Sequence, residues 1–207
     1  MLRTSMESTE QPVNKKLPVV WIHGANQSST CWNYLREKVS PKNEIIIDYS
    51  SFNRFYSNLQ NIKEQIGNQR VFIVGHSLGG LYALHLTKHC NIAGVVSIST
   101  PYRGSSAADW GRFMVPNYAL FRDVGRRSRP VLEGDRINIS IPYTQIVSTR
   151  GSVPYIHGAN DGVITVGSMR HRCSDMTCID VAATHYEVLL SDTVANIILK
   201  KYKNVKD

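Results

Sequence analysis

Short apolar runs alternate along the chain with segments whose apolar residues recur at helical spacing. Runs rich in valine and isoleucine predict strands, and such near-continuous apolar composition is typical of strands buried on both faces. The predicted strands cover 18–22, 44–48, 70–74, 94–98, 143–148 and 177–181, and the predicted helices cover 29–39, 55–66, 78–89 and 191–202. This alternation predicts an α/β fold, a mostly parallel sheet with helices on both faces.

Length and composition fit one soluble globular domain. The chain has 207 residues, of which 42% are hydrophobic and 19% charged, and no apolar run approaches the roughly 18 residues of a membrane-spanning segment. Residues 1–16 are polar and lack the apolar stretch of a secretory signal. We expect a disordered arm over 1–16 and a single domain over 17–207. The default location is cytoplasmic, although an exported form whose signal had been removed would have the same sequence.

The connection between the fourth and fifth predicted strands is unusually long. It contains aromatic and aliphatic side chains, among them Trp110, Phe113 and Met114. Long insertions in compact domains are commonly functional, so we predict a small cap or lid at about 102–138 whose apolar residues contact the substrate. The segment 125–130 is expected to be its polar, mobile exit. The alternative is a pair of ordinary packed helices.

The chain is basic, with a formal net charge of +8. Its basic residues fall into separate central and C-terminal groups, and neither has the interleaved aromatics of a surface that binds single-stranded nucleic acid. A solvated surface is therefore favoured, with peripheral contact to an anionic membrane or polymer as the alternative and no nucleic-acid partner expected.

The cysteines are too few and scattered for a disulfide scaffold. Buried thiols are the favoured interpretation of Cys31, Cys90, Cys173 and Cys178, with a local bridge between Cys173 and Cys178 as the lesser alternative. The spacing of these two residues matches no strong zinc pattern, so we expect no metal.

A Gly-His-Ser-Leu-Gly-Gly segment at 75–80 directly follows the third predicted strand and opens the third predicted helix. In this context Gly-x-Ser-x-Gly is typical of a nucleophile elbow, a sharp strand-to-helix turn that exposes the serine hydroxyl at the carboxyl end of the strand. Gly75 and Gly79 lack the Cβ atoms that would obstruct the turn. Ser77 is therefore the candidate nucleophile.

A serine nucleophile needs a base, and the base needs an orienting acid. In the chain order serine, acid, histidine, the base follows the last strand, which selects His185. The other histidines lie in the oxyanion loop, in the elbow, on the following helix, close to the acid or in a charged segment: His23, His76, His85, His89, His157 and His171.

The candidate acid is Asp161, in an Asn-Asp-Gly turn after the fifth predicted strand. Backbone N–H groups of such a turn can fix one carboxylate oxygen while the other receives the imidazole Nδ1–H. A simple Asx turn is the alternative. Asp175 and Asp180 are weaker candidates for the acid, and Asp180 should lie within the last strand and point elsewhere.

Two backbone amides are suitably located to stabilise an oxyanion. Leu78 follows the nucleophile at a helix start, and Ala25 lies in the loop after the first predicted strand. Gly24 permits a close backbone approach, and His23 is expected to brace this loop. Asn26 or Gln27 could supply a further side-chain donor.

These segments, together with Ser99–Ser105 and Asn160–Thr165, resemble the α/β-hydrolase superfamily over about residues 17–203, and in particular small bacterial serine lipases and esterases. The resemblance implies a three-layer fold, a triad of Ser77, Asp161 and His185, an oxyanion hole at Ala25 and Leu78, and no cofactor. The early antiparallel strands of larger members are missing, so we expect a compact sheet of about six strands. Tyr102 stands where related lipases often have histidine and is a candidate substrate contact.

The leading hypothesis is an esterase or lipase that forms an acyl-enzyme on Ser77. A thioesterase or an acyltransferase would use the same residues. A binding protein that keeps the hydrolase fold without catalysis is disfavoured because all three members of the triad are present. A metal-dependent hydrolase is disfavoured because the sequence has no His-Glu-x-x-His motif.

Overall fold

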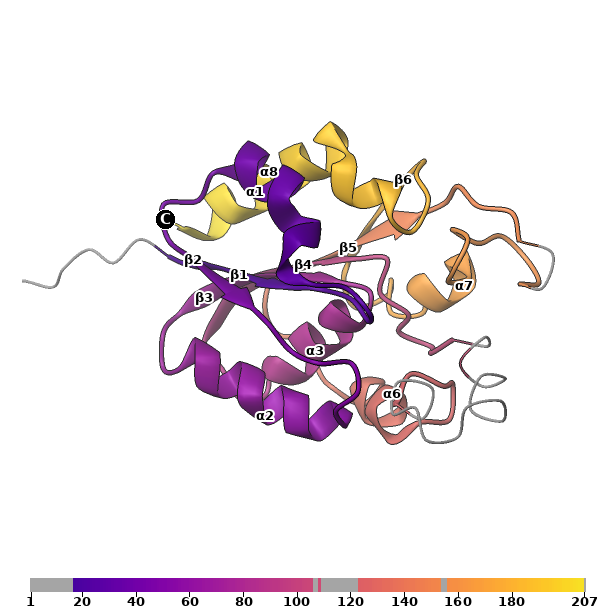
Figure 1. The fold of residues 1–207 in the computed structure, drawn as a ribbon, viewed down its shortest axis with the longest axis horizontal. Helices are drawn as coiled ribbons and strands as arrows, with labels where there is room; N and C mark the ends of the chain where they lie inside the picture. Colours follow the sequence, from indigo (N-terminus) through magenta and orange to yellow (C-terminus); the bar gives the residue numbers. More distant parts are fainter. Residues whose placement is uncertain (1–16, 106–107, 109–122, 154–155, 207) are drawn as a thin grey trace, which may run out of the picture.

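The structure of the protein, a computed structural model, describes residues 17–105, 108, 123–153 and 156–206 (Figure 1). The predicted arm over 1–16 lies outside the described residues. So does most of the predicted cap, including Trp110, Phe113 and Met114. The described part of the chain contains the sheet, its covering helices and every predicted member of the triad.

The centre of the fold is a six-stranded sheet in the order β2-β1-β3-β4-β5-β6. All neighbouring strands pair in parallel, so their carboxyl ends share one edge. This confirms the predicted α/β class and the predicted number of strands. The strands are β1 (Val19–Ile22), β2 (Glu44–Ile47), β3 (Val71–His76), β4 (Ile92–Ile98), β5 (Tyr143–Ser148) and β6 (Thr177–Val181).

Helices cover both faces of the sheet (Figure 1). On one face lie α1 (Asn33–Val39) and α8 (Asp192–Lys206), and on the other lie α2 (Phe55–Ile66), α3 (Leu78–Leu86) and α6 (Arg129–Gly134). The short elements are η1 (Ser29–Trp32), α7 (Val166–Met169) and η2 (Glu187–Leu190). None of the described helices has the length and apolar composition needed to cross a bilayer.

Each strand contributes to two cores because successive side chains point to opposite faces. In β1, Val20 and Ile22 join the core beneath α2 and α3, whereas Val19 and Trp21 join the core beneath α1 and α8. Complete burial of a side chain such as Ile22 contributes about 1.5–3 kcal/mol. This packing on both faces holds the strand ends in fixed positions, and the loops that follow these ends carry the candidate chemistry.

The predicted polar exit at 125–130 is wrong in its second half, because α6 begins at Arg129. Ser128 is its N-cap, and the Ser128 Oγ accepts a hydrogen bond from the Val131 N–H. Proline lies in the first turn, where its missing N–H has no intrahelical partner to lose. The Ser-Arg-Pro sequence at 128–130 is therefore a helix start signal, although the charged and polar residues around it favoured the interpretation of a loop.

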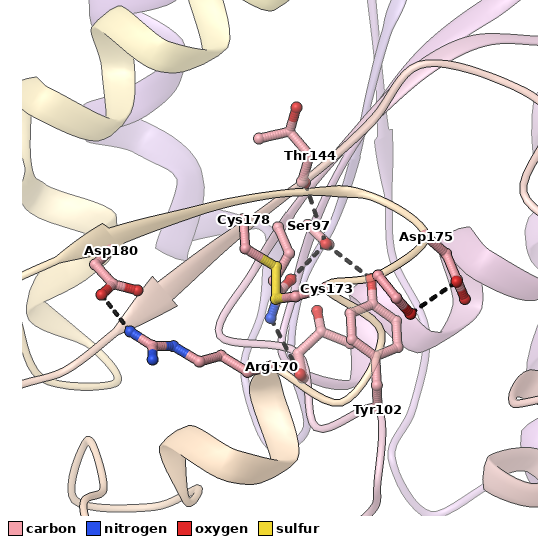
Figure 2. Close-up of a disulfide and its surroundings, with 11 residues drawn as sticks. Ser97, Tyr102, Thr144, Arg170, Cys173, Asp175, Cys178 and Asp180 are labelled. Carbon is pink, nitrogen blue, oxygen red and sulfur yellow. Dashed lines mark hydrogen bonds and ion pairs between the residues drawn. A yellow bond between two sulfur atoms is a disulfide. The ribbon is translucent and has the colours of Figure 1, made fainter.

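Cys173 and Cys178 form a disulfide, with their Cα atoms 5.6 Å apart (Figure 2). The favoured interpretation of these two as buried thiols is therefore wrong, whereas Cys31 and Cys90 are free. Beside the bridge, the buried Arg172 side chain donates to the carbonyl oxygens of Gly134 and Ile137 at 2.6 and 2.7 Å. The bridged segment thus holds the chain where it returns from α6 towards β5.

Candidate active site

Ser77 occupies a strained turn between β3 and α3. Its φ of 51° lies in the left-handed region, which is uncommon for a residue with a side chain and is typical of functional turns. The Ser77 N–H donates to the Ile98 carbonyl at 2.8 Å. A Cβ at Gly75 would lie 2.6 Å from the Gly79 carbonyl oxygen, and one at Gly79 would collide with the Ile22 carbonyl oxygen. Both glycines are therefore required for this turn, as the sequence predicts.

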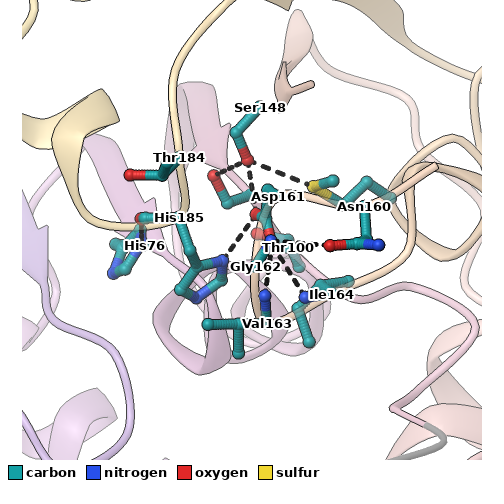
Figure 3. A network of polar contacts seen from close by, with 12 residues as sticks. His76, Thr100, Ser148, Asn160, Asp161, Gly162, Val163, Ile164, Thr184 and His185 are labelled. Carbon is teal, nitrogen blue, oxygen red and sulfur yellow. Dashed lines mark hydrogen bonds and ion pairs between the residues drawn. The ribbon is translucent and has the colours of Figure 1, made fainter. Parts of the chain in front are cut away.

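His185 and Asp161 meet at the carboxyl edge of the sheet, as their positions in the sequence predict (Figure 3). The distance between His185 Nδ1 and Asp161 Oδ2 is 2.7 Å, and both side chains are buried. An ionised carboxylate can only accept, so Nδ1 carries a proton, and in the neutral form of the ring the lone pair is on Nε2. The His185 N–H also donates to the Asp161 carbonyl at 2.9 Å. This arrangement orients an imidazole to act as a base.

The Asp161 carboxylate has donors at both oxygens. Ser148 Oγ donates to Oδ2 at 2.5 Å, and the N–H groups of Val163 and Ile164 donate to Oδ1 at 3.0 and 2.7 Å. Burial by itself raises the pKa of Asp161, but the hydrogen bonds from His185, Ser148 and Ile164 outweigh burial and lower that pKa. Asp161 therefore stays ionised opposite the imidazole.

Ser77 and the His185 loop are neighbours through His76. The His76 ring lies 4.8 Å from the His185 ring between centroids, and His76 Nε2 is 2.9 Å from the His185 carbonyl oxygen. Within the described residues, the His185 ring is hydrogen-bonded to Asp161 and not to Ser77. Contacts between nucleophile and base are commonly long in unliganded enzymes and tighten when substrate binds.

The predicted oxyanion loop follows β1, and its first residues are buried. His23 stacks on Tyr49 with centroids 4.2 Å apart, and the Tyr49 hydroxyl donates to the His23 carbonyl at 2.8 Å, which supports the predicted bracing role. Ala25 is half-buried and Leu78 is buried at the first position of α3. Asn26 has a φ of 54°, and its N–H donates to Ser51 Oγ at 2.9 Å.

Tyr102 is not at the surface of the site. Its ring is 2% exposed within the core beneath α2 and α3, and its hydroxyl lies 2.8 Å from Ser97 Oγ and 3.0 Å from the Tyr143 hydroxyl oxygen (Figure 2). The predicted contact between Tyr102 and substrate is therefore wrong. The tyrosine was placed by its position in the motif, whereas its apolar ring and polar tip fit a buried hydrogen-bonded site.

The weaker candidates for the acid are engaged elsewhere. Asp175 accepts from Arg172 Nε at 2.6 Å, and Asp180 pairs with Arg170, both of these side chains being exposed (Figure 2). Within the described residues, no group of three or more His, Cys, Asp or Glu side chains is placed to hold a metal ion.

The roles of two residues in the site were not predicted from the sequence. Ser148 ends β5, and its hydroxyl contacts both the Asp161 carboxylate and Ser99 Oγ, the latter at 2.6 Å. Gln27, considered only as a possible donor to substrate, has its amide oxygen 2.9 Å from the Gly24 nitrogen and 2.8 Å from His76 Nδ1. A polar residue at the carboxyl end of a parallel strand was the available signal for Ser148.

Comparison with known proteins identifies the family. A sequence model described as "Alpha/beta hydrolase family" matches residues 19–160, and the chain belongs to this family. Membership supports a hydrolase function. No protein of curated function matches the sequence.

Solved structures of low sequence identity share the fold. A lipase-esterase related protein from Clostridium acetobutylicum is 15% identical with a TM-score of 0.59, over 93% of this chain and 96% of the other. Tomato methylketone synthase I, solved with 2-tridecanone, is 15% identical with a TM-score of 0.64, over 92% of this chain and 99% of the other. The Bacillus licheniformis lipase BlEst2 is 19% identical with a TM-score of 0.66, over 93% of this chain and 51% of that one.

Proposed function

We propose that the protein is a serine hydrolase that cleaves carboxylic esters through an acyl-enzyme on Ser77. The observation that carries the proposal is the buried pair of His185 and Asp161, 2.7 Å apart. The His185 ring lies 4.8 Å between centroids from that of His76, the residue that directly precedes the strained turn at Ser77. A buried imidazole whose Nδ1–H is held by a carboxylate presents the unprotonated Nε2 that a serine nucleophile requires.

In the first half-reaction, Ser77 Oγ attacks the ester carbonyl carbon while its proton passes to His185 Nε2. The tetrahedral intermediate collapses as the imidazolium returns that proton to the leaving alcohol, which breaks the acyl–oxygen bond. Water then attacks the carbonyl carbon of the acyl-enzyme while its proton passes to His185 Nε2. As the second tetrahedral intermediate collapses, the imidazolium returns the proton to Ser77 Oγ, the bond between Ser77 Oγ and the acyl carbon breaks, and the carboxylic acid is released. Asp161 keeps its charge throughout and stabilises the imidazolium.

We assign to the N–H groups of Ala25 and Leu78 the role of donating hydrogen bonds to the oxyanion of each tetrahedral intermediate. Leu78 is the first residue of α3, and the leading amides of a helix have no intrahelical acceptor. The positive end of the helix dipole adds to the attraction at this point. One such donor is worth roughly 2.7–4 kcal/mol of transition-state stabilisation.

The proposal predicts saturable hydrolysis of p-nitrophenyl esters by the purified protein. The direct test is a series of acyl chains from acetyl to dodecanoyl, measured as nitrophenol release with and without EDTA. We expect turnover that EDTA leaves unchanged, with a dependence on chain length that reports the size of the acyl site. A faster first turnover would indicate accumulation of the acyl-enzyme.

Parallel reactions separate the related chemistries. Matched thioesters and an added acceptor alcohol distinguish ester hydrolysis from thioester hydrolysis and acyl transfer, which would use the same residues. Folded protein that hydrolyses none of the esters, or activity that EDTA abolishes, would contradict the proposed function.

A further inference from the structure

We propose that Gln27 and His76 are positioning residues, forming a bridge that ties the oxyanion loop to the backbone of His185. The inference depends on the proposed function, since it assigns roles in the same reaction. The bridge joins the loops after β1 and β6 to the last residue of β3, at the carboxyl edge of the sheet. Its two members do not carry out a proton transfer themselves.

The contacts of the bridge are continuous. Gln27 Oε1 accepts from the Gly24 N–H at 2.9 Å and lies 2.8 Å from His76 Nδ1. The other ring nitrogen of His76 lies 2.9 Å from the His185 carbonyl oxygen. The approach at Gly24 is close enough that a Cβ there would lie 2.6 Å from Gln27 Oε1 and 2.9 Å from His76 Nδ1. The absence of a Cβ at Gly24 thus leaves room for these two side chains.

His185 is consequently held at its ring Nδ1 and at both of its backbone polar groups. Asp161 fixes its Nδ1 and its backbone N–H, and His76 fixes its carbonyl. Without the third contact, the hydrogen bonds of His185 itself would all be to Asp161, although its loop is also held at Ala183 and Glu187 by Arg150. Because His76 directly precedes Ser77, the same ring relates the base to the nucleophile, and a small displacement of either is costly in rate.

The chemistry of His76 suits a structural link. The ring is completely buried, and burial, with a smaller contribution from His185, lowers the pKa of His76 to about 3. A neutral ring has one N–H. We place it on Nε2, because the buried His185 carbonyl can only accept. The half-buried Gln27 amide must then turn its NH₂ group towards Nδ1, and in doing so it gives up the hydrogen bond from the Gly24 N–H; Gln27 itself still ties the loop after β1 to His76.

The test compares kcat and KM for p-nitrophenyl butyrate in five variants. Gln27→Ala and His76→Ala each remove part of the bridge. His76→Gln places an amide nitrogen near the position of Nε2, whereas His76→Asn reaches only the position of Nδ1. The matched control is His85→Ala, because His85 is also buried and also contacts a backbone carbonyl, that of Pro130 at 2.8 Å. Circular dichroism and thermal unfolding check the fold of each variant.

We expect Gln27→Ala and His76→Ala to lower kcat roughly 10- to 100-fold, with KM little changed and kcat of His85→Ala close to wild type. His76→Gln should recover more of kcat than His76→Asn. If the variants of Gln27 and His76 match His85→Ala in kcat, the bridge is overturned. The proposed function would still stand in that case, provided that the wild type hydrolyses the ester. If His76→Ala does not fold, the kcat of Gln27→Ala tests the bridge by itself, because Gln27 is only half-buried. A folded wild type without turnover would remove the proposed function and the bridge together.

Discussion

Replacement of His185 by alanine is expected to reduce kcat for ester hydrolysis by roughly 10⁶-fold, because loss of the base costs about as much as loss of the whole triad. The protein should still fold. Asp161, which loses one partner, keeps hydrogen bonds from Ser148, Val163 and Ile164, so its buried charge remains satisfied. The measurement is steady-state hydrolysis of p-nitrophenyl butyrate, with circular dichroism on the same samples.

The matched control is His157→Ala. His157 is exposed and precedes the acid in the sequence, and its removal should leave kcat within a factor of about two, as for most surface substitutions. Retained turnover in His185→Ala, or an equal loss in both variants, would show that His185 is not the base.

Asp161→Asn is expected to lower kcat about 10⁴-fold through the tautomer of His185. The N–H groups of Val163 and Ile164 donate to Oδ1, so the oxygen of the new amide must face them. Its NH₂ group then faces His185 Nδ1, which can only respond by accepting. The imidazole proton moves to Nε2, and the base loses the lone pair that would receive the Ser77 proton.

Asp180→Asn provides the control for this variant, because Asp180 is an exposed carboxylate paired with Arg170. Its kcat should match wild type. The steady-state assay and the unfolding midpoint are compared for both variants. If Asp161→Asn stayed within a few-fold of wild type, the carboxylate would have no role in setting the tautomer.

Much of the fold could be predicted because buried parallel strands carry a strong signal. The bounds of β5 and β6 and of α2 coincide with the predicted segments. In α2 the buried residues Phe55, Leu59, Ile62 and Ile66 recur at helical spacing. The predicted helix at 29–39 is instead η1 followed by α1. Helix α6 was obscured because arginines around its start suggest a solvated loop, although Ser128 and Pro130 are a recognisable start signal.

The candidate site was predictable where chain order and backbone geometry dictate it. Ser77, Asp161 and His185 follow from strand ends that topology brings to one edge. The contacts of Ser148, Gln27 and His76 depend on loop conformations and on the register of neighbouring strands, which side-chain patterns do not encode. Tyr102 shows the opposite case, in which position within a motif suggested a surface role while packing placed the ring in the core.

Intact-mass analysis after treatment with a fluorophosphonate tests the central claim most directly, because the reagent captures an activated serine without knowledge of the natural substrate. Wild type and Ser77→Ala are treated in parallel after their folding has been checked. We predict one adduct on wild type and none on Ser77→Ala. No adduct on folded wild type, or an equal adduct on Ser77→Ala, would contradict the assignment of Ser77 as the nucleophile.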